Sequence, residues 1–183
     1  MEMARRPNPR GELPIVAESA YVDPGAVLIG NVSVEEDVFI GPGAVIRADE
    51  PGSSIEIGRG SNVQDRVVIH ALEGSRVCIG EGVSLAHGCV VHGPCTIGAG
   101  CFVGFGSVVF RAELGEEVVV RHLAVVEGVE IEAGRLVGSG CVIDSPTKAR
   151  RLKPPEHGDA DFAKRVAAMN LLLTEGYRER SGG

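Results

Sequence analysis

Aliphatic residues recur at every sixth position along most of this chain, interrupted by a few short offsets. A hexapeptide period is typical of a parallel β-helix, in which three short strands form one coil of a triangular prism. Twenty-one such positions predict about seven coils, stacked at the strand spacing of about 4.8 Å. We therefore expect residues 14–144 to form an all-β solenoid. The expected inward positions are Val16, Val22, Leu28, Val34, Ile40, Ile46, Ile57, Val63, Ile69, Ile79, Leu85, Val91, Ile97, Val103, Val109, Leu114, Val120, Val126, Ile131, Val137 and Ile143.

The pattern changes at both ends of the chain. Residues 1–13 are polar and Pro-rich, which indicates an arm, and residues 145–158 form a basic linker in which consecutive prolines exclude helix. Residues 159–178 are expected to form an α-helix, with Asp159 or Asp161 as its cap. Its apolar residues recur at helical spacing and should pack on the prism. They are Phe162, Val166, Met169, Leu173 and Tyr177.

Composition narrows the class of protein. The 183 residues are 44% hydrophobic and 4% aromatic, which suits one domain with a core too thin for large rings. A net charge of -7 disfavours a nucleic-acid partner, and no apolar run predicts a membrane span or a signal peptide. The five cysteines form no CxxC pair, and Cys89, Cys95 and Cys101 share one repeat position. We expect reduced core thiols in a cytoplasmic protein.

Two histidines are predicted to stack on one face of the prism. His70 and His92 each follow an inward residue by one position, and those inward residues are three hexads apart, which is one full coil. Both side chains should therefore point outward, one strand spacing apart. Arg47 lies one coil earlier in the same column.

His87 belongs to the preceding face, where Gln64 and Asp65 lie one coil earlier. Five residues of extended chain span about 15 Å, so His87 and His92 of one chain are too far apart to share an ion bonded at ~2.0–2.1 Å. A shared ion requires a neighbouring subunit, and a closed threefold ring is the simplest arrangement that repeats the contact.

Three neutral imidazoles with an open fourth position are typical of a catalytic zinc site, where the pKa of bound water falls to about 7. The alternative is that His70, His87 and His92 only fill polar turn and face positions. Their spacing, beside Arg, Asp, Gln and Glu residues, favours the metal site.

The segments SNVQDRVVIHALE and VSLAHGCVVHGPCTIG, with RADE upstream and NLLLTEGYRE near the C-terminus, closely resemble the γ-class carbonic anhydrases, including their carboxysomal branch. The resemblance covers about residues 14–180. It implies a left-handed β-helix, a homotrimer, and Zn(II) or Fe(II) bound by His70 and His92 of one chain and His87 of the next.

The resemblance also implies roles for other residues. Arg47 and Asp49 match an ion-paired interface group, Asp65 matches a residue that pairs across the subunit boundary, and Gln64 matches the amide that orients water or bicarbonate. Glu50 matches a carboxylate used in hydration and proton movement. Asn170 matches a helix asparagine near the CO2 pocket.

Glu73 stands where the prototype has a proton-shuttle glutamate. The prototype carries a long acidic loop there, whereas this chain has only residues 71–76. Without the resemblance, each of these residues also has a structural interpretation. Arg47 and Asp49 could form a surface salt bridge, and Gln64 could form a hydrogen bond at a corner of the prism. Glu50 could be a solvated turn residue, and Asn170 could be a helix residue without a functional role. His122 is expected to be structural.

The resemblance implies reversible hydration of CO2 to bicarbonate, with no organic cofactor. A hexapeptide-repeat acyltransferase is one alternative, since it uses this fold with a single histidine as general base. A catalytically weak assembly trimer is another, because intact ligands permit catalysis without establishing it.

Overall fold

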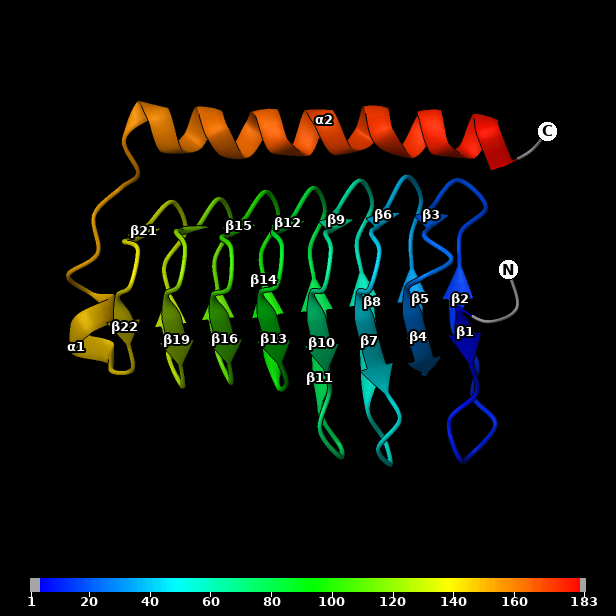
Figure 1. Ribbon diagram of the computed structural model, residues 1–183. Coiled ribbons are helices and arrows are strands. Elements are labelled where there is room, and N and C mark those ends of the chain that lie inside the picture. The colour runs from blue at the N-terminus through cyan, green and yellow to red at the C-terminus, as the bar shows by residue number, and fades with distance from the viewer. Residues whose placement is uncertain (1–3, 182–183) are drawn as a thin grey trace.

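The chain folds into a parallel β-helix of about seven coils, confirming the prediction from the hexads (Figure 1). The structure is a computed structural model that describes residues 4–181, without the side chains of His157, Ala160 and Ser181. Each coil contributes one strand to each of three parallel sheets, A, B and C, which form the sides of the prism. Two helices, α1 (Pro146–Ala149) and α2 (His157–Ser181), follow the last coil.

The strands are short, as the hexapeptide repeat requires. Sheet A contains β1 (Arg5–Arg6), β4 (Val27–Gly30), β7 (Val45–Ala48), β10 (Val68–His70), β13 (Val90–His92), β16 (Val108–Phe110), β19 (Val125–Glu127) and β22 (Val142–Ile143). Sheet B contains β2 (Ile15–Val16), β5 (Val32–Val34), β8 (Ser54–Ile57), β11 (Arg76–Ile79), β14 (Cys95–Ile97), β17 (Glu113–Leu114) and β20 (Glu130–Ile131). Sheet C contains β3 (Tyr21–Val22), β6 (Phe39–Ile40), β9 (Asn62–Val63), β12 (Ser84–Leu85), β15 (Phe102–Val103), β18 (Val119–Val120) and β21 (Leu136–Val137).

The core is the column of aliphatic side chains that the repeat predicts. All of the expected inward residues are buried except Val16 and Val22, which lie in the first coil and are partly exposed. The two longest offsets in the repeat become loops 49–53 and 71–75, which follow β7 and β10 and extend beyond the prism (Figure 1). These loops carry Glu50 and Glu73, and they leave successive coils at the same edge of the prism.

Sheet A presents two columns of side chains on its outer face. The first, here called the valine column, is formed by Val27, Val45, Val68, Val90, Val108, Val125 and Val142, which pair in register from coil to coil. The second, the histidine column, is formed by Arg47, His70, His92, Phe110 and Glu127. The register confirms that Arg47, His70 and His92 stack on one face, as predicted.

Both termini differ in detail from the prediction. The arm contributes β1, which pairs in parallel with β4 and so extends sheet A by one strand. The segment predicted to be a linker contains α1, although Pro154 and Pro155 are not helical. The long helix begins at His157, two residues earlier than predicted, and continues to Ser181. Among residues 4–181 no helix has both the length and the apolar character needed to cross a membrane.

Helix α2 lies along sheet C for the length of the prism (Figure 1), and it packs there with the predicted Phe162, Val166 and Tyr177 but not with Met169 and Leu173. Met169 is 56% exposed and Leu173 is 39% exposed. The most buried positions of this face are the polar residues Asn170 and Thr174. Aromatic contacts fix the two ends of the helix. These are Phe162 against Phe102, and Tyr177 stacked on Tyr21 at 4.8 Å.

Candidate metal centre

Half of the predicted metal site is assembled within one chain. The ring nitrogens His70 Nδ1 and His92 Nε2 lie 3.0 Å apart, with the rings edge to face. This contact follows from the repeat, because β10 and β13 pair in register and place both rings outward at the same position. Phe110 packs edge-on against His92 one coil further along.

The surroundings of His70 favour its neutral form. Burial lowers the pKa of its imidazole, the Arg47 guanidinium and His92 lower it further, and Glu50 and Asp49 act in the opposite direction. Its Nε2 atom is buried and makes no hydrogen bond of good geometry, although Glu50 Oε1 lies 3.4 Å away and Asp49 Oδ1 3.6 Å away. A neutral imidazole is the form that binds a metal ion.

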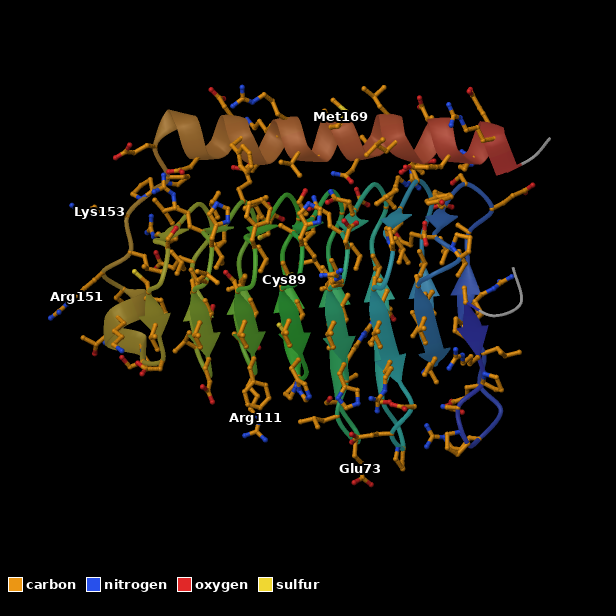
Figure 2. All side chains as sticks on the ribbon, in the orientation of Figure 1. Glu73, Cys89, Arg111, Arg151, Lys153 and Met169 are labelled. Atoms are coloured by element: carbon orange, nitrogen blue, oxygen red, sulfur yellow. The ribbon has the colours of Figure 1, made fainter. Side chains whose placement is uncertain are left out.

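The acidic residues next to His70 are fixed by different partners. Asp49 forms an ion pair with Arg47 at 3.2 Å. The Glu50 carboxylate accepts a hydrogen bond from the main-chain N–H of Glu73 through Oε2, at 2.6 Å. The Glu73 side chain is exposed and points away from the prism (Figure 2). The structure therefore brings Glu50 to His70, and Glu73 contributes its backbone to this group.

The second half of the site lies at the corner that follows sheet C. His87 Nδ1 is 3.4 Å from Asp65 Oδ2, and both side chains are about half exposed. Asp65 and Gln64 follow β9, one coil before His87, as the repeat predicts. His87 also stacks on Phe105, whose ring centroid is 5.6 Å away.

Gln64 is oriented by a buried hydrogen-bond chain that the sequence did not predict. Gln64 Nε2 donates to Asn62 Oδ1 at 3.0 Å, and Asn62 Nδ2 donates to Ser84 Oγ at 2.7 Å. All three side chains are buried. Because the amide nitrogen of Gln64 is engaged, its Oε1 atom is left to accept a hydrogen bond.

An open hollow of about 400 Å³ joins this corner to helix α2. Gln64, His87 and Asn170 line it together with Phe105 and Arg165. Asn170 is 8% exposed, and its Nδ2 donates to Val166 O at 2.9 Å. The structure therefore brings the helix asparagine next to Gln64 and His87, together with Phe105 and Arg165, which were not foreseen.

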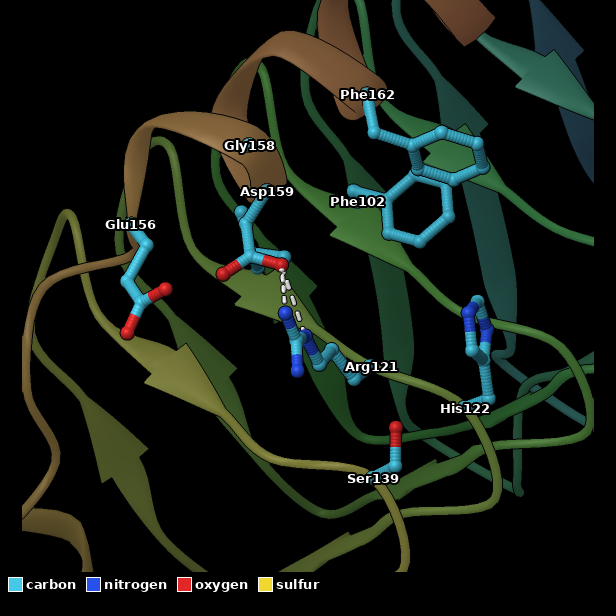
Figure 3. Close-up of a pocket in the computed structure, with 9 residues that line it drawn as sticks. Phe102, Arg121, His122, Ser139, Glu156, Gly158, Asp159 and Phe162 are labelled. Atoms are coloured by element: carbon cyan, nitrogen blue, oxygen red, sulfur yellow. Dashed lines mark hydrogen bonds and ion pairs between the residues drawn. The ribbon is translucent and has the colours of Figure 1, made fainter.

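A second hollow, of about 480 Å³, lies at the start of α2 (Figure 3). The Arg121 guanidinium donates to Asp159 Oδ1 there through Nε, at 2.8 Å, and Nη2, and so ties the helix to the prism. His122 lines the same hollow and stacks on Phe105 at 4.4 Å. Its Nδ1 accepts a hydrogen bond from the Phe105 N–H, which supports the structural role predicted for this histidine.

The two halves occupy different positions on one chain. His70 and His92 are on sheet A, whereas His87 follows β12 of sheet C. Within residues 4–181, no three His, Cys, Asp or Glu side chains are grouped so that they could hold a metal ion. A site with three histidine ligands thus requires two copies of the chain.

Comparison with known proteins shows that this chain is similar to several hexapeptide-repeat proteins. The family model described as bacterial transferase hexapeptide (six repeats) matches residues 14–48 and 77–111. A carbonic anhydrase of Methanosarcina thermophila is 37% identical over 95% of this chain and 78% of that protein. The carboxysome assembly protein CcmM of a Nostoc species is 40% identical over 88% of this chain, which spans only 31% of that protein. A solved hexapeptide transferase family protein from Anaplasma phagocytophilum aligns with a TM-score of 0.81 and 28% identity, over 97% of this chain and 99% of that one.

Proposed function

This chain belongs to the γ-class carbonic anhydrase family of hexapeptide-repeat proteins, and we propose that it catalyses the reversible hydration of CO2 to bicarbonate. The proposed site is a metal ion held between subunits of a homotrimer. The observation that carries the proposal is the paired His70 and His92 on one face, with His87 beside Gln64 and Asn170 at another corner.

The residues present fit a Zn(II) or Fe(II) ion bound by His70 and His92 of one chain and His87 of its neighbour. Two imidazole nitrogens bonded to one tetrahedral ion at ~2.0–2.1 Å lie about 3.3 Å apart. The 3.0 Å separation of His70 Nδ1 and His92 Nε2 is close to that value. Asp65 can hold His87 through Nδ1, which leaves Nε2 for the ion. When bound, the ion would supply Lewis-acid activation of water.

Gln64 and Asn170 are the residues proposed to orient the reactants. The Oε1 atom of Gln64 accepts a hydrogen bond from the attacking water or from the hydroxyl of bicarbonate. Its direction is set by Asn62 and Ser84, which hold the other end of the amide. Asn170 and Phe105 line the hollow beside His87, where a small apolar molecule such as CO2 can approach.

Glu50 is the residue proposed to move the proton. Hydration of CO2 by one water yields bicarbonate and one proton, which must leave the site before the next turnover. The Glu50 carboxylate lies 3.4 Å from His70 and stands on a loop at the edge of the prism, so it can pass a proton from the site to buffer. Glu73 takes part through its N–H, which holds Glu50 in place.

Side-by-side packing of parallel copies, which the proposed homotrimer requires, is supported by the valine column. Valine side chains at successive coils face outward and stay partly exposed, and Val142 is 47% exposed. A second copy whose axis runs parallel has the same coil spacing, so it can cover this column along its whole length. In the proposed trimer, the same contact would bring His87 of one copy to His70 and His92 of the next. Arg47, which is 44% exposed, is then expected to meet Asp65 of the neighbouring copy.

Stopped-flow measurement of CO2 hydration on anaerobically purified protein, with metal analysis of the same sample, tests the proposal. We expect one ion per chain and hydration that is lost when the ion is removed by a chelator. Acyl transfer from acetyl-CoA by metal-free protein would instead favour the acyltransferase. Fully metal-loaded trimers without hydration would favour the assembly role.

A further inference from the structure

The N-terminal arm folds back onto the loop that carries Glu50. After β1, residues 8–12 form a tight turn around the buried Asn8, whose Oδ1 accepts hydrogen bonds from the N–H groups of Arg10 and Glu12. Asn8 Nδ2 reaches Ala48 O at 3.5 Å. Gly30 leaves room for this contact, because a Cβ atom there would lie 2.1 Å from Ala48 O and 3.2 Å from Asn8 Cβ.

Arg10 continues the contact onto Glu50 itself. Its Nη2 atom donates to the main-chain oxygen of Glu50 at 2.9 Å and pairs with Glu12 Oε2 at 3.0 Å. Hydrogen bonds from Asn8 and Arg10 lower the pKa of the Glu12 carboxyl, so Glu12 stays ionised and keeps the guanidinium in place. An exposed ion pair of this kind adds little stability by itself. Its effect here is to orient the Arg10 side chain toward the Glu50 carbonyl.

The Glu50 residue is thus held at two points from outside its loop. Arg10 fixes its carbonyl, and the Glu73 N–H fixes its carboxylate. Ser53 adds a hydrogen bond from Oγ to the same carbonyl at 2.7 Å, but from within the loop. Removing the Arg10 side chain would take away one of the hydrogen bonds that hold the Glu50 loop against the prism. It would not change any residue of the histidine column.

We propose that Arg10 is a positioning residue that sets the place of the Glu50 carboxylate next to His70. The proposal rests on the proposed function, because Glu50 matters as a relay only if the protein releases a proton in each turnover. Through Arg10, the arm controls how fast that proton leaves. It does not control how CO2 reacts.

The test compares Arg10→Ala with Arg6→Ala, which removes the same charge from the same arm at an exposed position of β1. In Arg10→Ala we expect kcat to fall about 3- to 10-fold, a fraction of what direct loss of an acid–base group costs. The ratio kcat/KM and the metal content should stay the same, and imidazole buffer should restore kcat. Arg10→Lys keeps a charged donor but loses the planar guanidinium, so its kcat should lie between those of Arg10→Ala and Arg6→Ala.

Hydrogen exchange of the Glu73 amide, measured over residues 71–76 in metal-free protein, is a second readout that does not depend on activity. It should speed up at least about threefold in Arg10→Ala and stay unchanged in Arg6→Ala, because a displaced Glu50 no longer protects that N–H. In the Glu50→Ala background, Arg10→Ala should add no further loss of kcat.

An active enzyme in which Arg10→Ala leaves kcat unchanged would overturn the proposal, whatever the exchange. If the wild-type protein does not hydrate CO2, the proposed function is rejected, and faster Glu73 exchange in Arg10→Ala would then support only the contact between the arm and the loop.

Discussion

The Glu50 carboxylate accepts a 2.6 Å hydrogen bond from the main-chain N–H of Glu73, so two glutamates considered for proton transfer have unequal positions. Only the Glu50 side chain is directed at His70. We expect Glu50→Ala to lower kcat by at least about tenfold, with partial rescue by imidazole. Glu73→Ala keeps the N–H and should lower kcat less than twofold. Stopped-flow rates at several buffer concentrations decide this, and a fully active Glu50→Ala variant would remove the relay from the mechanism.

His92→Ala should abolish metal retention and CO2 hydration while the prism stays folded. The side chain points outward from sheet A, so its loss leaves no cavity in the core. Metal analysis, activity and circular dichroism on the same preparation measure the three effects. His122→Ala provides the matched control, because His122 is not a proposed ligand and this variant should therefore retain the metal. Near-stoichiometric metal in His92→Ala would reject the three-histidine site.

Mixed assemblies test whether the ligands come from two chains. His70→Ala and His87→Ala should each be inactive alone, yet an interface between one chain of each type can contain every ligand. Random refolding of equal amounts forms this ordered pair at about a quarter of the interfaces of a cyclic trimer. We expect metal and activity to return to about that fraction. Absence of any rescue in folded mixed trimers would show that the sharing model is wrong.

The cysteines should differ sharply in reactivity. Burial raises the pKa of the Cys89, Cys95 and Cys101 thiols to about 12, whereas Cys141 is exposed. Iodoacetamide at pH 8 should therefore label Cys141 first and the three buried thiols only after denaturation. Mass spectrometry of native and unfolded samples measures this, and rapid native labelling of Cys89 would contradict it.

The same shifts predict a loss of stability in alkali. Unfolded thiols, with a pKa near 9.0, lose protons that the folded protein retains. The free energy of unfolding should therefore fall as the pH rises above about 9. Urea titrations between pH 8 and 11 measure the slope, which should be smaller in Cys89→Ala than in Cys141→Ala.

The periodic part of this protein could be predicted almost completely from its sequence. Because the repeat has a fixed period, the position of each side chain can be found by counting residues. The stacking of His70 with His92, and the position of Asp65 one coil before His87, could therefore be predicted from the sequence. The counting is reliable because a shift of one residue would turn the whole aliphatic set outward.

The aperiodic parts could not be predicted in this way. A two-residue strand such as β1 is too short to show a hydrophobic period. Its place in sheet A depends on the main-chain groups of β4 with which it pairs. Helix α2 has leucines and Met169 on several sides, so apolar spacing did not distinguish the face that contains Asn170 and Thr174. The contact between Arg10 and Glu50 joins residues 40 apart through loops.

The valine column has a further consequence for assembly. Because it presents the same side chain at every coil, the contact proposed with a neighbouring copy would be almost unchanged if that copy slid by one coil. The histidine column differs at each level, and a slide of one coil would set His87 against Arg47 and His70, or against His92 and Phe110. In the proposed trimer, the histidines and their polar neighbours would therefore fix which coils of two copies lie side by side, and loss of a ligand is expected to permit staggered trimers as well as to prevent metal binding.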